Sequence, residues 1–181
     1  MRWQAVARRL RLPLGFLFAA VYLVFARPSP LTFAVGVGIA FAGLLVRAWA
    51  SGHIVKNDRL ATTGPYAHTR NPLYFGSFLL AAGFGIAGHL GLLLAVLVLF
   101  VLIYWPTMEK ERGEVRGRFP EAYAEYERNV PAFVPRPVPW RGAGAPAPEP
   151  FSFALYMRHK EWRAALGFAA ALGWLIYRMS W

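Results

Sequence analysis

The segment "GPYAHTRNPLYFGS", residues 64–77, places aromatic, cationic and amide side chains immediately before a long apolar run. Pro72 suits the first turn of a helix, because it has no amide hydrogen to leave without a partner. The start of such a helix attracts carboxylates, and the ring faces of Tyr66 and Tyr74 attract organic cations. The segment therefore predicts either a ligand-binding site beside Arg70 and Asn71 or a set of ordinary anchors at a membrane boundary.

A second group of charges follows the same apolar run. Glu109, Glu111 and Glu114 cluster there, in a chain with only 9 acidic residues. Glu111 and Glu114 share one face of a helix, whereas Glu109 points elsewhere. These acids are either a solvated helix face paired with neighbouring arginines or the carboxylate part of the same site. A zwitterion with an extra organic cation would fit the combined groups, and S-adenosylmethionine is such a ligand. The sequence has no glycine-rich nucleotide fingerprint, which excludes a Rossmann-type methyltransferase.

These polar residues lie between apolar stretches that predict membrane helices. The chain is 57% hydrophobic and only 16% charged, which is too apolar for a typical soluble domain. A helix needs about 20 apolar residues to cross the hydrocarbon core. The run 73–105 is too long for one span, and we expect it to turn near "GHLG" (88–91). We predict an all-α polytopic membrane bundle, one domain over residues 1–181, with spans at 12–26, 31–50, 73–87, 90–105 and 164–178.

The basic residues predict the orientation of this bundle. With a cytosolic N-terminus, 17 of the 20 lysines and arginines fall on the cytosolic side, as the positive-inside rule favours. Segments 51–72 and 106–162 then face the cytosol, and we expect a bacterial inner-membrane protein. Anionic lipid headgroups explain the net charge of +11, and no nucleic-acid partner is expected. The alternative for the first apolar stretch is a secretory signal peptide.

The two cytosolic segments offer little other chemistry. The chain has no cysteine, and its 4 histidines show no paired ligand spacing, so no metal site is expected.

Thr107 can cap a helix that runs to Arg118, and Pro120 can begin a second short helix. Seven prolines between positions 131 and 150 predict an extended arm. The stretch "FALYMRHKEW" (153–162) predicts an amphipathic helix at the membrane interface.

Two motifs carry a family resemblance. "GPYAHTRNPLYFGS" resembles the G-x-Y-x-x-x-R-[HN]-P-x-Y-x-G motif of the isoprenylcysteine carboxyl methyltransferase family and its phospholipid methyltransferase relatives. "ERGEVRGRFPEAYAEYERNVPAFVP" (111–135) resembles that family's second motif, E-E-x-x-L-x-x-x-F-G-x-x-Y-x-x-Y-x-x-x-V-P-x-x-x-P. The resemblance implies a helical membrane methyltransferase that encloses S-adenosylmethionine between cytosolic loops and helix ends. By resemblance, the cofactor contacts are Asp58, Arg59, Leu60, Ala61, Tyr66, Arg70, Asn71, Pro72, Leu73, Tyr74 and Glu111.

Four positions depart from the prenylcysteine pattern. Asn71 stands where eukaryotic prenylcysteine enzymes have histidine, Arg112 replaces the second glutamate, and Pro120 replaces a glycine. Thr107 stands where those enzymes carry an arginine near the substrate carboxylate. We therefore expect poor activity on prenylcysteine and a different small lipophilic or lipid-like acceptor.

The acceptor decides whether the reaction needs a base. A carboxylate needs none, whereas an amine or hydroxyl has to lose a proton. His53, His68 and Glu109 are the candidates for that role, and O-, N- and S-methylation all stay open. The alternatives are a phospholipid N-methyltransferase, an NADPH-dependent membrane enzyme of the sterol-reductase type, and a non-catalytic membrane protein that keeps the fold.

Overall fold

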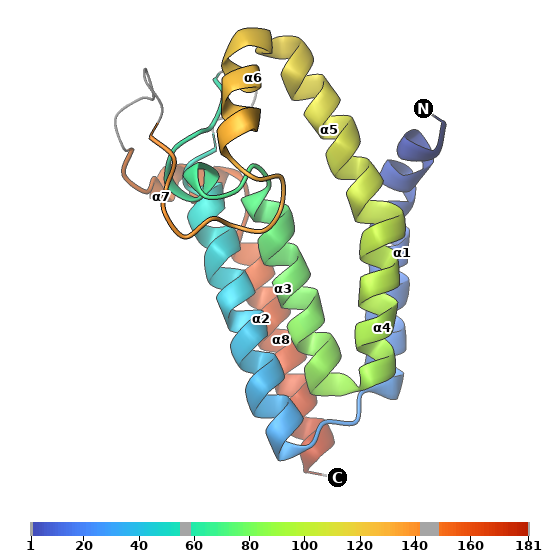
Figure 1. Ribbon diagram of the computed structural model, residues 1–181. Coiled ribbons are helices and arrows are strands. Elements are labelled where there is room, and N and C mark those ends of the chain that lie inside the picture. Colours follow the sequence, from blue (N-terminus) through green and yellow to red (C-terminus); the bar gives the residue numbers. More distant parts are fainter. Residues whose placement is uncertain (1, 55–58, 142–148, 181) are drawn as a thin grey trace.

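The computed structural model describes residues 2–54, 59–141 and 149–180, and the regular structure within these ranges is entirely helical. The long helices run side by side, and the loops and short helices gather at one end of the bundle (Figure 1). The elements are α1 (Arg2–Phe25), α2 (Pro30–Ser51), the 3-10 turn η1 (Gly64–Ala67), α3 (Pro72–Gly88), α4 (Leu90–Leu99), the π-helical segment η2 (Phe100–Tyr104), α5 (Trp105–Arg118), α6 (Pro120–Asn129), α7 (Phe153–Arg158) and α8 (Trp162–Met179). The predicted all-α fold is confirmed.

Glycines bring α2 and α3 together along their length. A Cβ atom added at Gly43 would lie 2.6 Å from the carbonyl oxygen of Gly76. A Cβ added at Gly36 would lie 2.7 Å from the Cβ of Ala87, nearer the other end of the pair. Neither position has room for a side chain, so the two backbones approach closely, as small residues allow between membrane helices. The pair is a rigid support for the loop that joins its members.

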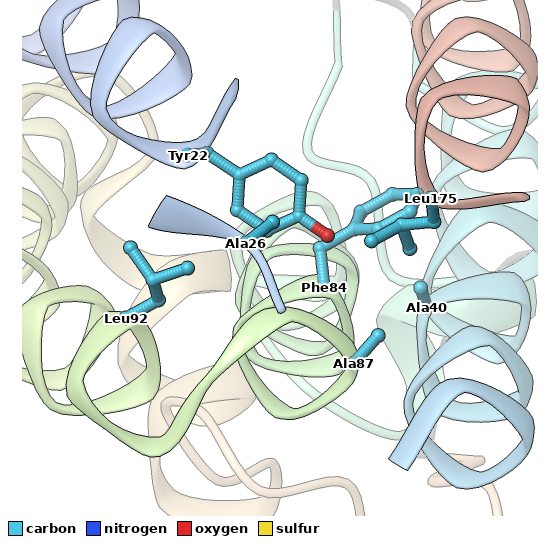
Figure 2. Packing of buried hydrophobic residues seen from close by; sticks show 7 residues of the cluster. All are labelled: Tyr22, Ala26, Ala40, Phe84, Ala87, Leu92 and Leu175. Atoms are coloured by element: carbon cyan, nitrogen blue, oxygen red, sulfur yellow. The ribbon is translucent and has the colours of Figure 1, made fainter. Parts of the chain in front are cut away.

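The helices converge at the end of the bundle that lies away from these loops. One cluster of buried side chains there contains Tyr22, Ala26, Ala40, Phe84, Ala87, Leu92 and Leu175 (Figure 2). Tyr22 packs edge-on against Phe84, with 6.1 Å between the ring centroids. His89 ends α3 and caps α4, where its ring accepts a hydrogen bond from the backbone amide of Gly91 at 3.0 Å. The predicted turn at 88–91 is confirmed, and this end of the bundle is closed.

Residues Leu90–Arg118 form one continuous helical rod through α4, η2 and α5. The expectation that Thr107 caps a new helix is therefore wrong: Thr107 is fully buried inside the rod, and its hydroxyl donates to the carbonyl of Ile103 at 2.7 Å. Pro106 lacks an amide hydrogen and would leave the carbonyl of Leu102 without its helical donor. A π-helical turn accommodates this proline within the helix. The indole nitrogen of Trp3 donates to the carbonyl of Leu102 at 3.2 Å.

Two helices in the described ranges are long and apolar enough to cross a membrane, Pro30–Ser51 and Leu90–Arg118. Leu12–Phe25 and Pro72–Gly88 are shorter apolar helices. Helices cover all five predicted spans, although α1 already begins at Arg2, ahead of the first apolar stretch. The protein is a helical membrane protein; the number of spans and their orientation stay predictions.

The segments after α5 follow the prolines and one unusual backbone angle. Pro120 opens α6, as predicted, and the arm 131–141 has neither helix nor strand. The helix expected over 153–162 is shorter, because α7 ends at Arg158 and Lys160 adopts a left-handed backbone with φ 56°. This reversal turns the chain into α8 beside the end of α2, where Ser152 donates its amide hydrogen to the carbonyl of Gly52 at 3.0 Å.

Candidate functional site

A cavity of about 440 Å³ lies between the loop that joins α2 to α3, the start of α3 and the exposed part of α5; we call it the loop cavity. Nine of the eleven residues that the resemblance placed at the cofactor line it: Arg59, Ala61, Tyr66, Arg70, Asn71, Pro72, Leu73, Tyr74 and Glu111. Leu60 instead packs against the cluster of Tyr123, Tyr126 and Val130. Asp58 lies outside the described residues.

The second sequence motif holds the first one in place. The hydroxyl of Tyr126 in α6 donates to the backbone carbonyl of Tyr66 at 2.6 Å. In the arm 131–141, the amide of Arg136 donates to the carbonyl of His68 at 2.9 Å. The amide of Arg70 in turn donates to the arm, also at 2.9 Å. The second motif therefore acts as a scaffold for the first, which is why the two lie together in the fold.

Asn71 and Pro72 begin α3 as predicted, but the Asn71 side chain is partly occupied. Its amide nitrogen donates to the carbonyl of Ala132 in the arm at 2.8 Å. The next arm residue, Phe133, packs its ring against Phe75 of α3 and Phe100 of η2, with centroid separations of 5.5 and 4.9 Å. The arm thus fixes the start of α3 and contacts the α4–α5 rod as well.

Arg70 ties the loop to α6 through Glu127. Its Nη1 donates to the Glu127 carboxylate at 2.5 Å and to the Tyr123 hydroxyl at 3.1 Å, and Arg112 donates to the same carboxylate at 2.8 Å. Burial acts to lower the pKa of Arg70, but the bonds to Glu127 and Tyr123 outweigh it and raise this pKa. Burial likewise acts to raise the pKa of Glu127, but Arg70, Arg112 and Arg116 outweigh it and lower this pKa. Both groups stay charged near neutral pH.

Two residues that line the loop cavity each carry a buried donor with no hydrogen-bond partner among the described residues. The donors are the hydroxyl of Tyr66, whose residue is only 6% exposed, and the Nε of Arg70. Burial raises the pKa of the Tyr66 phenol above its ordinary range; Arg47 opposes this, and Glu161 and Glu111 reinforce it. The phenol therefore keeps its hydrogen. Buried polar groups without a partner are rare, so both donors call for an acceptor that the described residues do not supply.

A second cavity of about 710 Å³ lies between α1, α2, α3 and the α4–α5 rod; we call it the inter-helix cavity. Leu12, Gly15, Phe16 and Ala19 form its wall on α1, where the Leu12 and Phe16 residues are 67% and 76% exposed. These residues are apolar and exposed. This wall of the cavity is therefore suited to contact with lipid tails.

The opposite wall of the inter-helix cavity carries an ion pair. Arg47, within the apolar helix α2, donates its Nε to the Glu161 carboxylate at 2.6 Å. Its Nη1 donates to the hydroxyl of Ser77 and, at 3.4 Å, to the carbonyl of Leu73 in α3. Charged residues inside an apolar helix are costly and usually face a partner or a water-filled cavity. Arg47 does both, and it joins α2, α3 and the start of α8.

The two cavities adjoin, because both are lined by Ile54, Leu73, Tyr74 and Glu111. At this shared wall the Tyr74 hydroxyl donates to the Glu111 carboxylate at 2.9 Å. The bond links α3 to α5 where the two cavities meet. A ligand in either cavity can therefore approach a ligand in the other beside this pair.

Comparison with known proteins bears on this arrangement. Residues 30–114, from the start of α2 into α5, match a family model described as phospholipid methyltransferase. The resemblance to membrane methyltransferases is confirmed. No solved structure matches the chain.

Two curated relatives carry names that concern metal resistance. The chain is 39% identical over 110 residues to the cobalt-zinc-cadmium resistance protein CzcN of Cupriavidus metallidurans. The matched segment covers 59% of this chain and 49% of that protein. It is 38% identical over 104 residues to the nickel-cobalt-cadmium resistance protein NccN of Alcaligenes xylosoxydans xylosoxydans, covering 56% of this chain and 47% of that protein. The chain thus spans about half the length of these relatives. The described residues contain no group of three or more His, Cys, Asp or Glu side chains that could hold a metal ion.

The three side chains considered as bases are each engaged by other groups of this methyltransferase-like chain. Both ring nitrogens of His53 contact backbone carbonyls, at 2.9 and 3.1 Å. His68 contacts a carbonyl of the arm through Nδ1 at 2.8 Å. Glu109 forms an ion pair with Arg112 at 3.0 Å. None of the three lines the loop cavity or the inter-helix cavity, and their bonds support the scaffold.

Among the residues of the inter-helix cavity that the sequence did not assign to a site are one histidine and the two members of an ion pair: His159, Arg47 and Glu161. Arg47 did carry a signal, since a lone arginine within an apolar helix is expected to have a partner. Nothing in the sequence assigns that partner to Glu161, which is 114 positions away. His159 lies directly before the left-handed Lys160, a turn that the sequence pattern did not reveal.

Proposed function

We propose that this protein is an S-adenosylmethionine-dependent methyltransferase that acts on a small lipophilic or lipid-like acceptor at the cytosolic membrane face. The observation that carries the proposal is the loop cavity itself, whose lining residues Tyr66 and Arg70 carry unpartnered buried donors within a segment that matches a methyltransferase family. The volume of about 440 Å³ lies in the range of pockets that hold molecules of this size.

The residues of the loop cavity fit this cofactor. When bound, S-adenosylmethionine supplies a methyl group on a positively charged sulfur. The Glu111 carboxylate, oriented by Tyr74, offers negative charge toward cationic groups, and the aromatic faces on the wall favour them as well. The Tyr66 hydroxyl and the Arg70 Nε offer donors to a carboxylate or to a ring nitrogen. The positive end of α3 begins at Pro72 on the same wall.

The inter-helix cavity fits a lipophilic acceptor. Its α1 wall is apolar and exposed, and its polar wall reaches the Tyr74–Glu111 pair that it shares with the loop cavity. A water-soluble cofactor then enters from the cytosolic loops, and the acceptor enters from the bilayer. The protein aligns the two and excludes water at the shared wall, which is its main contribution to an in-line displacement. The names of the two relatives state a resistance to metals and no reaction. The cavities are therefore what supports a lipophilic acceptor.

Calorimetric titration of the detergent-solubilised protein with S-adenosylmethionine and, separately, with NADPH tests the proposal. We expect binding of the first and none of the second. NADPH binding alone would favour the reductase alternative, and binding of neither would favour a non-catalytic membrane protein.

The variant Tyr66→Phe sharpens this test, because it removes a hydroxyl that has no partner in the protein itself. We expect unchanged thermal stability of the ligand-free protein and an affinity for S-adenosylmethionine that is lower by about 0.5–1.5 kcal/mol, one hydrogen bond. Tyr22→Phe is the matched control, because the Tyr22 hydroxyl is also buried without a partner but lies at the closed end. It should leave the affinity unchanged.

We also propose that the N-terminus and both cavities face the cytosol of a bacterial inner membrane. The support is the distribution of basic residues, which places 17 of 20 on that side. A topology reporter inserted near position 142 should report the cytosol, and one fused after position 181 should report the opposite side. Both reporters on one side would contradict the five-span arrangement.

A further inference from the structure

His159 lies at the turn between α7 and α8 and lines the inter-helix cavity. Its Nδ1 is 3.1 Å from the backbone carbonyl oxygen of Ser51, at the end of α2. The hydroxyl of Ser51 donates to the carbonyl of Ala48 at 2.8 Å and does not compete for this contact. The ring is therefore held by one of its nitrogens against the backbone of the rigid α2–α3 pair.

This contact fixes the tautomer of the neutral ring. A carbonyl oxygen only accepts, so Nδ1 must carry the hydrogen in the bond to Ser51. In the neutral imidazole the other nitrogen, Nε2, then has a free lone pair. Among the described residues Nε2 has no hydrogen-bond partner. The bond to the backbone thus holds His159 in the form that can accept a proton.

The other histidines do not combine these features. Both nitrogens of His53 contact carbonyls. His68 has the same Nδ1–carbonyl contact as His159, but it lines neither cavity. The Nδ1 of His89 accepts from Gly91 at the closed end of the bundle. Of the four histidines, His159 alone lines one of the two cavities.

We propose that His159 is the general base that removes a proton from an amine or hydroxyl acceptor in the inter-helix cavity. This inference rests on the proposed methyltransferase function. The acceptor heteroatom forms its new bond to the methyl carbon, the carbon–sulfur electron pair stays on the sulfur, and the acceptor proton moves to Nε2. No oxidant, reductant or further reactant is needed. The acceptor class is then a lipophilic amine or alcohol, because a carboxylate would have no proton to give.

The charges around His159 are compatible with this role. Arg47 and Glu161 line the same cavity but neutralise each other at 2.6 Å. Glu111 on α5, Tyr74 on α3 and Tyr104 on η2 also line it. The neighbouring Arg158 and Lys160 are exposed to solvent. Among the described residues Glu111 forms no ion pair, so it contributes negative charge to the wall of the same cavity.

The variant His159→Asn tests the inference, because the asparagine amide can keep the bond to Ser51 while the base is lost. With a lipid amine or alcohol as acceptor, we expect kcat to fall about 100-fold, with the affinity for S-adenosylmethionine unchanged. The acid limb of the pH profile of kcat/KM should disappear in this variant. His89→Asn is the control, since it makes the same change at a histidine that caps α4 at the closed end, where asparagine can also cap, and it should retain both the rate and the profile. A wild-type rate in His159→Asn would overturn the inference.

A readout without turnover separates this inference from the proposed function. In ¹⁵N NMR spectra of the cofactor-free protein in detergent, the neutral His159 ring should carry its hydrogen on Nδ1. A hydrogen on Nε2 would overturn the inference even if methyl transfer occurs. Labelled methyl found only in a prenylcysteine carboxylate, and not in lipid amines or alcohols, would also overturn it. A protein that binds no S-adenosylmethionine would instead overturn the proposed function.

Discussion

Helix α3 packs against α2 and against α4, and the two pairs differ in how closely the backbones approach along their length. In the α2–α3 pair, Gly43 and Gly36 keep the backbones in contact both near the loops and toward the closed end. In the α3–α4 pair, close approach is confined to the turn, where a Cβ added at Gly85 would lie 2.9 Å from the Cα of Leu93. Figure 1 shows the separation between α3 and α4 growing from the turn onward, before α5 bends back toward α6.

This difference explains where the cavities lie. Beyond the closed end, aromatic side chains and then the two cavities fill the space between α3 and the α4–α5 rod. The walls on α2 and α3 are fixed by backbone packing, whereas α1 contributes an apolar wall that is largely exposed. A group-transfer site benefits from this combination, because the donor has to be held accurately while the acceptor enters from lipid.

The largest effect is expected from breaking the α2–α3 contact. Gly43→Leu would place a side chain against the backbone of Gly76, 2.6 Å from its carbonyl oxygen, where no rotamer relieves the clash. We expect a loss of about 3 kcal/mol or more in the free energy of unfolding, at the upper end for overpacking. Thermal unfolding in detergent measures it. Gly38→Leu is the control, since an added Cβ there has nothing within 4 Å; an equal loss in the control would contradict the role of the close contact.

The second effect concerns the Tyr74–Glu111 bond, which bridges α3 and α5 where they have separated. Removal of either side chain should weaken S-adenosylmethionine binding at least tenfold, about 1.4 kcal/mol, because both line the loop cavity. Calorimetric titration of Tyr74→Ala and Glu111→Ala gives the affinities, and circular dichroism shows that the helices remain. Unchanged affinity in both variants would contradict the assignment of the cavity to the cofactor.

The third effect concerns the exposed apolar wall that α1 contributes to the inter-helix cavity. Gly15 lines the inter-helix cavity, and a Cβ added there meets nothing within 4 Å, so Gly15→Leu should fold normally. The new side chain would occupy space meant for the acceptor. We expect KM for the lipid acceptor to rise about tenfold, roughly 1.4 kcal/mol, with the affinity for S-adenosylmethionine unchanged. Gly38→Leu serves again as control, and a parallel loss of cofactor affinity in Gly15→Leu would contradict the separation of the two cavities.

Local patterns in the sequence predicted the helices and the meeting of the two motifs. Apolar runs, Pro72 and Pro120 mark helices by their own chemistry, and Tyr66, Tyr74 and Glu111 were placed at one site by their charges and by resemblance. All three line the loop cavity. Their roles toward the cofactor stay predictions.

The features that the sequence did not predict have a common physical cause: each depends on a contact with a residue far away in the chain. The carbonyl of Leu102, which Pro106 cannot serve as a donor, accepts from the indole of Trp3, 99 positions away. The sequence marks Arg47 as unusual but does not reveal its partner Glu161. His53 and His68 also contact backbone carbonyls whose positions a sequence does not show, and the role of the candidate bases stays a prediction.

The smallest effect concerns the ion pairs that fasten α6 to the loop. The pKa of Glu127 is lowered in the folded protein, because its bonds and ion pairs with Arg70, Arg112 and Arg116 outweigh burial. Its stabilisation is therefore fully present above the pKa of an unfolded glutamate, about 4.3, and is lost as the pH falls below this value through the folded pKa. We expect Glu127→Gln to cost on the order of 1 kcal/mol at pH 7 and less at pH 4, measured as the difference in thermal stability from the wild type. Glu125→Gln, on the same helix, is the control, and a cost for Glu127→Gln that does not shrink toward pH 4 would mean that the charge of Glu127 contributes nothing to the attachment of α6.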